Sequence, residues 1–141
     1  MKELLIKLNA CADAREWAEG KSWQEVYDTC HRGDWLLWLF AKTNPNDLQL
    51  LTLAKGHCAN TVRHLMRGGR SIKAVDAAIA FGEGMITKEE LAAARAAAHA
   101  ADAAAYTADV AQTKNQKETA DIVRKYIPIE KWNIDIDLKW N

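Results

Sequence analysis

The residues with the chemistry to bind a metal ion are three cysteines and four histidines. His57 and His64 are seven residues apart, so on one helix they stand about 10.5 Å apart along the axis. That is too far to share one ion as an i,i+4 pair does. Cys30 and His31 are adjacent and point apart. The spacing therefore predicts neither a metal site nor a cofactor, and histidines on helix surfaces are the simpler interpretation.

Nucleophilic catalysis needs a cysteine or serine beside a histidine and an acid. Cys58 follows His57, but sequence neighbours on a helix do not face each other. The chain has no Gly-x-Ser-x-Gly motif and no glycine-rich phosphate loop. Two carboxylates that meet only in the fold could still act as a hydrolase pair. We therefore expect a protein that is not an enzyme and keep an unrecognised hydrolase as an alternative.

A local basic cluster surrounds a helix break at Gly68-Gly69, and its members are Arg63, His64, Arg67, Arg70 and Lys73. Such a cluster can bind phosphate, which makes nucleic-acid binding a second alternative. Two observations favour a plainer interpretation: cations stabilise helix C-termini, and no aromatic residues alternate with the basic ones. The 19 basic and 19 acidic side chains give no net charge, which excludes a uniformly basic nucleic-acid binder.

Tryptophan is the residue type here that most favours a protein-binding surface. The chain has six, and tryptophan is over-represented at interaction hot spots. We expect Trp35 and Trp38 in the core. The candidates for contact with a partner are one residue of the first helix and four of the C-terminal tail: Trp17, Trp132, Asp135, Asp137 and Trp140. The alternative is that these tryptophans pack the tail onto the helices.

Helical periodicity dominates the elements that must position these residues. In the N-terminal half, the pattern predicts helices over 3–19, from the capping box Ser22–Glu25 to Gly33, and from an Asp34 cap through the apolar run 35–41. Further helices are predicted over 47–67 and from Ser71 to Gly82. A last one follows a Thr87–Glu90 capping box and runs along an alanine-rich stretch over 88–126. A continuous helix over 88–126 would be about 58 Å long. We therefore expect a bend or break near 113–117. The run 35–41 is the expected centre of the core.

The C-terminal tail changes period. From Trp132 to Asn141, five apolar positions alternate with five polar ones, which is typical of a β-strand. A lone strand cannot satisfy its own backbone groups, so we expect this tail to pair with a partner's sheet or with its copy in a homodimer. The predicted organisation is a helical domain over 1–128 and an extended amphipathic tail over 129–141.

Length and composition agree with one small domain. With 141 residues, 49% of them apolar, the chain can form one full core without disulfides or metal. The predicted fold is all-α: a single-domain bundle of about six helices with a long alanine-rich helix and a short β-like tail. We expect Cys11, Cys30 and Cys58 to be small buried residues of a reducing compartment. The sequence shows no secretion signal and no membrane span, so we expect a cytoplasmic protein.

Three motifs resemble one known family. Residues 11–17 read Cys-x-x-Ala-x-x-Trp, residues 30–39 read Cys-x-Arg-Gly-Asp-Trp-Leu-Leu-Trp-Leu, and residues 121–128 read Asp-Ile-Val-Arg-x-x-Ile-Pro. In these motifs the chain resembles small alanine-rich helical proteins of bacteria and phages described as immunity proteins. The resemblance covers about residues 4–128, and the tail from Ile129 lies outside it.

The resemblance implies a protein that neutralises another protein by direct contact. In a bacterium the partner would be a toxin. In a phage genome it would be a host defence component, as for an anti-CRISPR protein. The resemblance assigns no site residues to this chain. The expected function is therefore a non-enzymatic inhibitor that covers a surface of its partner.

Overall fold

The structure of the chain is a computed structural model that describes residues 1–61, 63–65, 69–93 and 109–134. Its regular elements are α1 (Lys2–Lys7), α2 (Ala12–Ala18), α3 (Trp23–Thr29), α4 (Gly33–Thr43), α5 (Leu48–Asn60), the 3₁₀ helix η1 (Arg63–Leu65), α6 (Gly69–Gly82), helical residues 88–93, α8 (Asp109–Tyr126) and the 3₁₀ helix η2 (Ile129–Lys131). These ranges contain no strand, so the predicted all-α class is confirmed. They hold more helices than the six expected.

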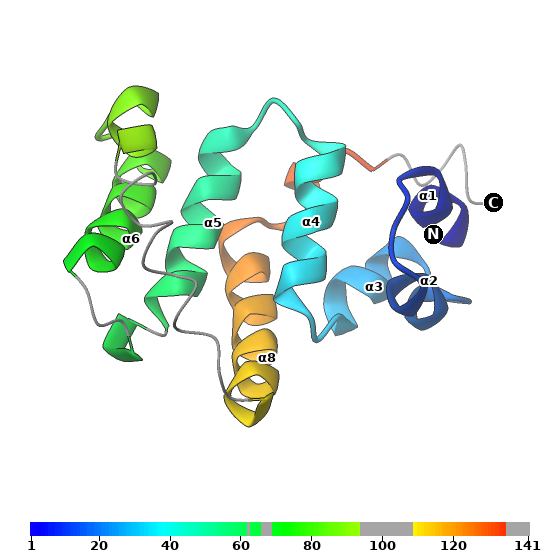
Figure 1. Cartoon of the computed structure of the whole chain (residues 1–141). Helices are drawn as coiled ribbons and strands as arrows, with labels where there is room; N and C mark the ends of the chain where they lie inside the picture. Colours follow the sequence, from blue (N-terminus) through cyan, green and yellow to red (C-terminus); the bar gives the residue numbers. More distant parts are fainter. Residues whose placement is uncertain (62, 66–68, 94–108, 135–141) are drawn as a thin grey trace.

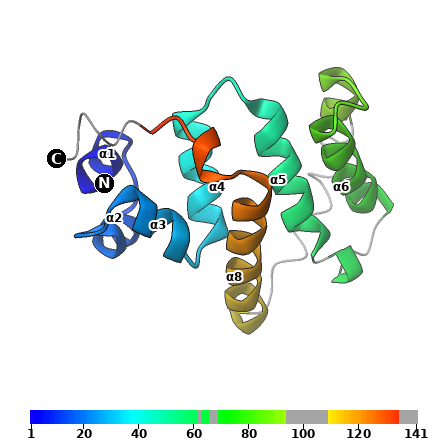
Figure 2. The same cartoon turned by 180° about the vertical axis from the view of Figure 1, so that it is seen from behind.

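The helices lie side by side in an elongated row (Figures 1 and 2). Helix α5 packs against α6 on one side and against α8 and α4 on the other, and α4 also packs along α8. Helices α1, α2 and α3 lie at the opposite end of the row from α6. No helix among the described residues is long and apolar enough to cross a membrane.

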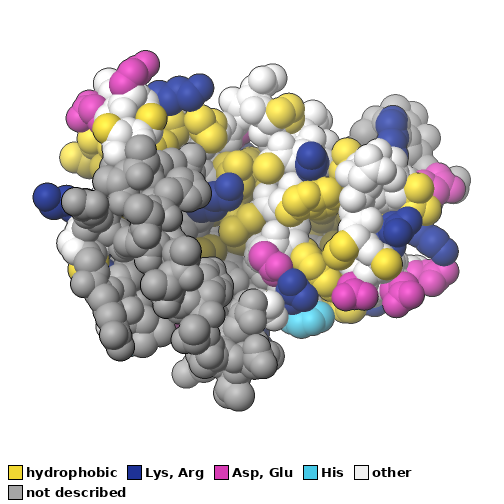
Figure 3. All heavy atoms as spheres, viewed as in Figure 1, with side chains coloured by type: hydrophobic (Ala, Val, Ile, Leu, Met, Phe, Trp, Pro, Cys, Tyr) yellow, Lys and Arg dark blue, Asp and Glu magenta, His cyan; other side chains and the backbone are white. Residues whose placement is uncertain are grey.

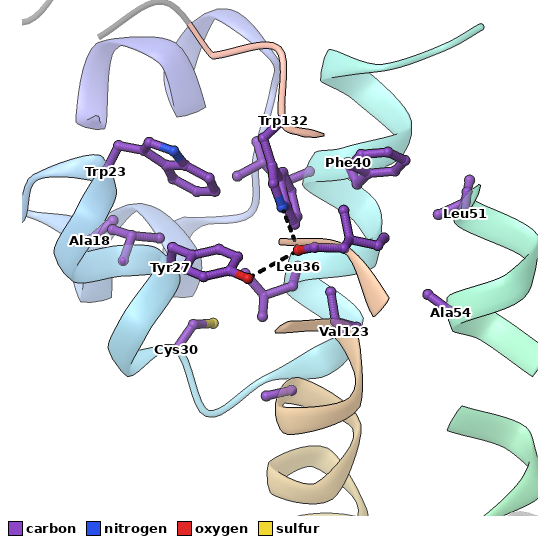
Figure 4. Packing of buried hydrophobic residues seen from close by; sticks show 14 of the residues in the cluster. Ala18, Trp23, Tyr27, Cys30, Leu36, Phe40, Leu51, Ala54, Val123 and Trp132 are labelled. Carbon is purple, nitrogen blue, oxygen red and sulfur yellow. Dashed lines mark hydrogen bonds between the residues drawn. The ribbon is translucent and has the colours of Figure 1, made fainter. Parts of the chain in front are cut away.

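The core is centred on α4, as the apolar run 35–41 predicts. Leu36, Leu39 and Phe40 are each at most 3% exposed. Aromatic side chains of α3 and the C-terminal segment close around them, with the Trp132 ring 5.0 Å from that of Phe40 and 5.1 Å from that of Trp23 (Figure 4). The beginning of the predicted tail is thus part of the same core as the helices.

The C-terminal ends of α3 and α8 satisfy each other's backbone carbonyls. The Tyr27 hydroxyl, with one proton to donate, lies 3.0 Å from the carbonyl oxygens of both Arg124 and Ile127. In return, the Arg124 guanidinium donates to the carbonyls of Tyr27 (3.1 Å) and Cys30 (2.8 Å). The Trp132 indole N–H donates to the Ile127 carbonyl at 3.1 Å (Figure 4). We call Tyr27, Arg124 and Trp132, with the carbonyls they bind, the carbonyl clasp.

The caps predicted at Ser22 and Thr87 are confirmed, and a third helix start, at Asp47, is also capped by a side chain. The Ser22 hydroxyl accepts the Glu25 N–H at 3.2 Å, and the Asp47 carboxylate accepts the Leu50 N–H at 3.1 Å. At Thr87 both halves of a capping box form, because the Thr87 hydroxyl accepts the Glu90 N–H while the Glu90 carboxylate accepts the Thr87 N–H, each at 3.2 Å. Pro128 follows the end of α8 as expected.

The predicted helix over 3–19 is wrong, because the chain forms two helices there. Asn9 has a left-handed backbone (φ 60°), and its N–H and that of Ala10 bond back to the carbonyls of Ile6 and Leu5. This pair of bonds is a Schellman closure with asparagine in the position that glycine usually takes. Because asparagine is the less frequent residue there, the sequence signal was easy to miss.

Three further boundaries differ from the prediction. Helix α5 ends at Asn60, short of 67, because the Thr61 N–H (3.2 Å) and hydroxyl (2.7 Å) both bond to the Cys58 carbonyl and close the last turn. Helix α6 begins at Gly69, before the predicted Ser71 cap. The break expected near 113–117 is absent, since α8 runs through that segment on good helix formers such as lysine and glutamine.

The β-like tail is not supported where the structure describes it. Residues 129–131 form a 3₁₀ turn, and Trp132 to Ile134 are irregular. The Asn44 side chain holds this segment on α4, donating to the Lys131 carbonyl (2.9 Å) and accepting the Asn133 N–H (3.0 Å). The remainder of the predicted strand, 135–141, lies outside the described residues.

Gly33 permits a close approach between α4 and α8. Sequence reasoning placed it at the end of the preceding helix, with Asp34 as the next cap. Instead, Gly33 is the first residue of α4, and Arg32 takes the N-cap position without a side-chain cap. A Cβ atom at Gly33 would stand 2.6 Å from the backbone carbonyl carbon of Thr119 in α8. Glycine is therefore required here by packing.

We expect Gly33→Ala to lower the free energy of unfolding by about 1–3 kcal/mol, because α4 must move away from α8 to admit a methyl group. Gly69→Ala is the matched control, since a Cβ there meets nothing within 4 Å. Gly69→Ala should lower the free energy of unfolding by less than about 0.5 kcal/mol. Urea unfolding of the two variants and the wild type measures both. Equal midpoints for the two variants would show that the contact with Thr119 is not tight.

Candidate functional site

The connection between α3 and α4 places polar side chains at the surface. Cys30 and Arg32 have extended backbones, and His31 between them is exposed. Arg32 donates two hydrogen bonds to Asp34, from Nε to Oδ1 at 2.9 Å and from Nη2 to Oδ2 at 2.6 Å. A bidentate ion pair therefore links the N-cap residue of α4, Arg32, to Asp34 in its first turn.

The charge of Asp34 is matched within the chain. Burial acts to raise the pKa of Asp34. The hydrogen bonds and charge of Arg32, together with a hydrogen bond from the Trp35 backbone N–H, outweigh that effect and lower the pKa below its ordinary value. Asp34 therefore stays ionised at neutral pH and presents little uncompensated negative charge.

Three aromatic rings from two separate segments meet beside this ion pair. The ring centroid of Trp17, in α2, lies 5.9 Å from that of His31 and 6.1 Å from that of Trp35. The His31 and Trp35 centroids are 6.2 Å apart. All three pairs are tilted or edge-to-face, which are arrangements that aromatic rings prefer. Trp17 and Trp35 are half-buried, so part of each ring is available at the surface.

Two cations flank the aromatic rings. Lys21 Nζ lies 4.6 Å from the Trp17 ring centroid and donates to the Trp17 carbonyl at 2.5 Å. The Arg32 guanidinium carbon lies 4.6 Å from the Trp35 ring centroid. Both are within cation–π range. We call the five residues Trp17, Lys21, His31, Arg32 and Trp35 the aromatic face. On the side shown in Figure 3, hydrophobic and charged side chains are interleaved at the α1–α4 end.

An apolar cavity of about 420 Å³ adjoins the aromatic face. It lies among α1, α2, α3 and the first turns of α4, and Trp17 and Trp35 belong both to its wall and to the face. Trp38, one turn further along α4, also lines it. We call this space the α1–α4 cavity. A surface pair of indoles backed by a cavity is an arrangement suited to binding an apolar group.

The three cysteines differ in exposure, which corrects the expectation that all are buried. Cys11 is exposed and stands just before α2, whereas Cys30 and Cys58 are buried. Burial raises the pKa of the Cys30 thiol and raises the pKa of Cys58 to about 12. Only Cys11 is therefore suited to react with reagents in the folded protein.

The predicted contact residues have different outcomes. Trp17 lies in the aromatic face. Trp132 is only 6% exposed and packs in the core, so its prediction as a contact residue is wrong. Its indole N–H donates to the Ile127 carbonyl, and its ring packs against those of Trp23 and Phe40. Asp135, Asp137 and Trp140 lie outside the described residues, and a role for them stays a prediction, as does a homodimer through the tail.

Of the alternative basic patch, the structure describes the side chains of Arg63 and Lys73, so the patch as a whole stays a prediction. Arg63 donates from Nη1 and Nη2 to the two carboxylate oxygens of Asp76, at 2.6 and 3.1 Å. Lys73 is exposed on α6, while Arg67 and the Arg70 side chain fall outside what the structure describes. The pairing with Asp76 lowers the net positive charge that Arg63 could offer to phosphate.

His57 and His64, the two histidines considered above for metal binding, lie in different environments. The His57 ring stacks on Tyr126 of α8, with centroids 4.0 Å apart and an interplanar angle of 5°. Burial lowers the pKa of His57, aided by the charge of Lys125 and opposed by that of Glu83. His64 is exposed. Within the described ranges no three histidine, cysteine or carboxylate side chains gather as a metal site would require.

Comparison of the chain with protein-family models, curated proteins and solved structures found no match in any of the three. The site is therefore interpreted from its own geometry.

Sequence reasoning found one member of the aromatic face and missed the others. Trp35 was expected in the core, but it is half-buried and contacts Trp17 at the surface. His31 and Lys21 were not singled out. Lys21 lies beyond the end of α2 and Arg32 before the first residue of α4, so the helical spacing rule for side-chain pairs predicts neither cation–ring contact. The meeting of the two segments depends on tertiary packing.

We expect a thiol reagent such as dithionitrobenzoate to react rapidly with one cysteine of the native protein and with three after unfolding. Cys11→Ser should abolish the rapid phase. Cys58→Ser should leave it unchanged, because burial protects Cys58 and raises its pKa to about 12. Absorbance kinetics, with mass spectrometry to locate the label, give the measurement. Rapid labelling of Cys58 in the native protein would contradict the buried placement.

Proposed function

We propose that this protein is a non-enzymatic inhibitor that binds another protein through the aromatic face. The observation that carries the proposal is the Trp17–His31–Trp35 cluster: three rings packed on one another, partly exposed, and flanked by Lys21 and Arg32. Tryptophan and arginine are the residues most enriched at binding hot spots.

The contacts that hold the aromatic face in place support this role. Its loop follows Cys30, whose carbonyl accepts a hydrogen bond from Arg124, and precedes Gly33, which packs tightly on α8. The rings also restrain one another. A preformed surface loses little conformational entropy on binding, which favours tight association with a partner.

The resemblance to immunity proteins points to the kind of partner. The motif over 30–39 that carries the resemblance includes two members of the aromatic face, Arg32 and Trp35, and a third member, His31, stands at its variable position. A toxin in a bacterial setting, or a host defence component in a phage setting, is the partner we propose, and both would be met in the cytoplasm. Nucleic-acid binding is less favoured, since Arg63 is already paired with Asp76.

The test places a photo-crosslinking amino acid at position 31, in the middle of the face, and at Met85 as the matched control. Met85 is 74% exposed and belongs to the turn after α6, at the other end of the molecule. Irradiation in cells of the source organism should join a discrete protein to position 31 and not to position 85.

The Trp17→Ala and Trp35→Ala substitutions should weaken binding of that crosslinked protein, once purified, by about 30-fold or more each. Met85→Ala should leave the affinity unchanged. Calorimetry gives the affinities, and circular dichroism checks that each variant is folded. Equal affinities for Trp17→Ala, Trp35→Ala and wild type would show that the partner does not bind at the aromatic face.

A further inference from the structure

The α1–α4 cavity has the size of a small-molecule site and is open to solvent. Its volume of about 420 Å³ falls within the ~300–1,000 Å³ range of ligand pockets. Three of the residues that line it, Asn9, Cys11 and Asp34, are exposed, so the cavity opens to solvent beside them. A molecule in solution can therefore enter it.

The wall of the cavity offers no free partner to a charged ligand. Among the described residues that line it, Asp34 is the only acidic one, and none has a lysine or arginine side chain. Both oxygens of Asp34 already accept hydrogen bonds from Arg32, at 2.9 and 2.6 Å. Apart from the Asn9 amide, the other lining side chains are aliphatic, aromatic or sulfur-containing. A charged ligand would lose its hydration here without gaining an ion pair.

Two titratable groups of the lining residues show the same effect on their own charge. Burial raises the pKa of the Cys30 thiol, and burial lowers the pKa of the Met1 amino group against the opposing charge of Glu3. The thiol is an anion when ionised and the amino group is a cation. The surroundings therefore disfavour charge of either sign, which favours an uncharged occupant.

Aromatic and sulfur-containing side chains form much of the wall. The indoles of Trp17, Trp35 and Trp38 line the cavity together with the sulfur-bearing side chains of Met1 and Cys11. Aromatic rings attract one another in tilted and edge-to-face arrangements, and sulfur atoms contact ring edges favourably. An aromatic ligand gains these contacts in addition to burial, whereas a saturated hydrocarbon of the same size gains burial alone.

We propose that the α1–α4 cavity binds a small, uncharged aromatic molecule, held among the indoles of Trp17, Trp35 and Trp38. The volume matches a ligand of this kind, the rings of the wall select its aromatic body, and the lack of a free ion-pair partner excludes charged forms of it. This site does not depend on the proposed protein-binding function, although both use Trp17 and Trp35.

The experiment titrates the purified full chain with N-phenyl-1-naphthylamine, an uncharged aromatic probe that fluoresces more strongly in apolar surroundings than in water. We expect saturable binding of one probe per chain. Displacement of the probe is then compared for 1-methylnaphthalene, 1-naphthoate and 1-naphthylmethylamine, which carry no charge, a negative charge and a positive charge on the same ring system. Both charged compounds should displace the probe at least about tenfold less effectively than 1-methylnaphthalene.

A second comparison tests the preference for aromatic ligands. Naphthalene and decalin, its saturated counterpart, are each added at the same fraction of their solubility in water, which removes the difference in their hydrophobicity. Naphthalene should displace the larger share of the probe, because only naphthalene makes ring contacts with the indoles.

Two variants of α2 locate the site. Ala14 lines the cavity, whereas Ala12, on the same helix, is exposed and lines a separate groove. Ala14→Phe should abolish probe binding by filling the cavity. Ala12→Phe, the same substitution outside the cavity, should leave the affinity unchanged. Circular dichroism checks that both variants are folded.

Protection of Cys11 tests the site in the unaltered protein, and so keeps the proposal testable if Ala14→Phe does not fold. Cys11 is exposed and lines the cavity. At a probe concentration ten times its dissociation constant, alkylation of Cys11 by N-ethylmaleimide should slow roughly tenfold, because only the unoccupied fraction of the protein reacts.

The proposal is overturned if the probe does not bind saturably, or if alkylation of Cys11 is not slowed by it. It is also overturned if a charged naphthalene displaces the probe as well as 1-methylnaphthalene does, if decalin equals naphthalene, or if folded Ala14→Phe binds the probe like Ala12→Phe. None of these results bears on the crosslinking test of the aromatic face, because no partner protein is present.

Discussion

The described fold depends on the carbonyl clasp between α3 and α8. Carbonyls in the last turn of a helix have no partner within that helix. Here the carbonyls of Arg124 and Ile127 lie against the Tyr27 hydroxyl, and the Ile127 carbonyl also accepts a hydrogen bond from the Trp132 indole. In the other direction, the carbonyls of Tyr27 and Cys30 accept hydrogen bonds from the Arg124 guanidinium. Leaving one such buried carbonyl unpaired costs about 1–3 kcal/mol. Segments nearly 100 residues apart are therefore held together at one place.

The position of the candidate site follows from this clasp. Cys30 is held by Arg124 immediately before the exposed loop, and Gly33 is seated on Thr119 immediately after it. Helix α8 thus fixes both ends of the connection that carries His31 and Arg32. The outer surface of α4 can then present Trp35 to Trp17 with little freedom to move, which is what a preformed binding surface requires.

Sequence patterns predicted what is local and failed where tertiary contact decides. The caps at Ser22 and Thr87 and the buried run around Leu36 follow from side chains a few positions apart. The break at Asn9 was missed because asparagine is a weaker helix-ending signal than glycine. At Gly33 the local pattern predicted a helix end. The glycine instead begins α4, and its lack of a side chain allows α4 to contact α8. The aromatic face combines segments that no local pattern connects.

The most direct test of the account is a double-mutant cycle across the clasp. The free energies of unfolding of the wild type, Tyr27→Phe, Arg124→Met and the double variant are measured in urea. If the two side chains hold the same junction, the double variant should be more stable than the sum of the single losses predicts, by about 1 kcal/mol or more. Additive losses would show that α3 and α8 are held independently and would contradict the clasp as the basis of the fold.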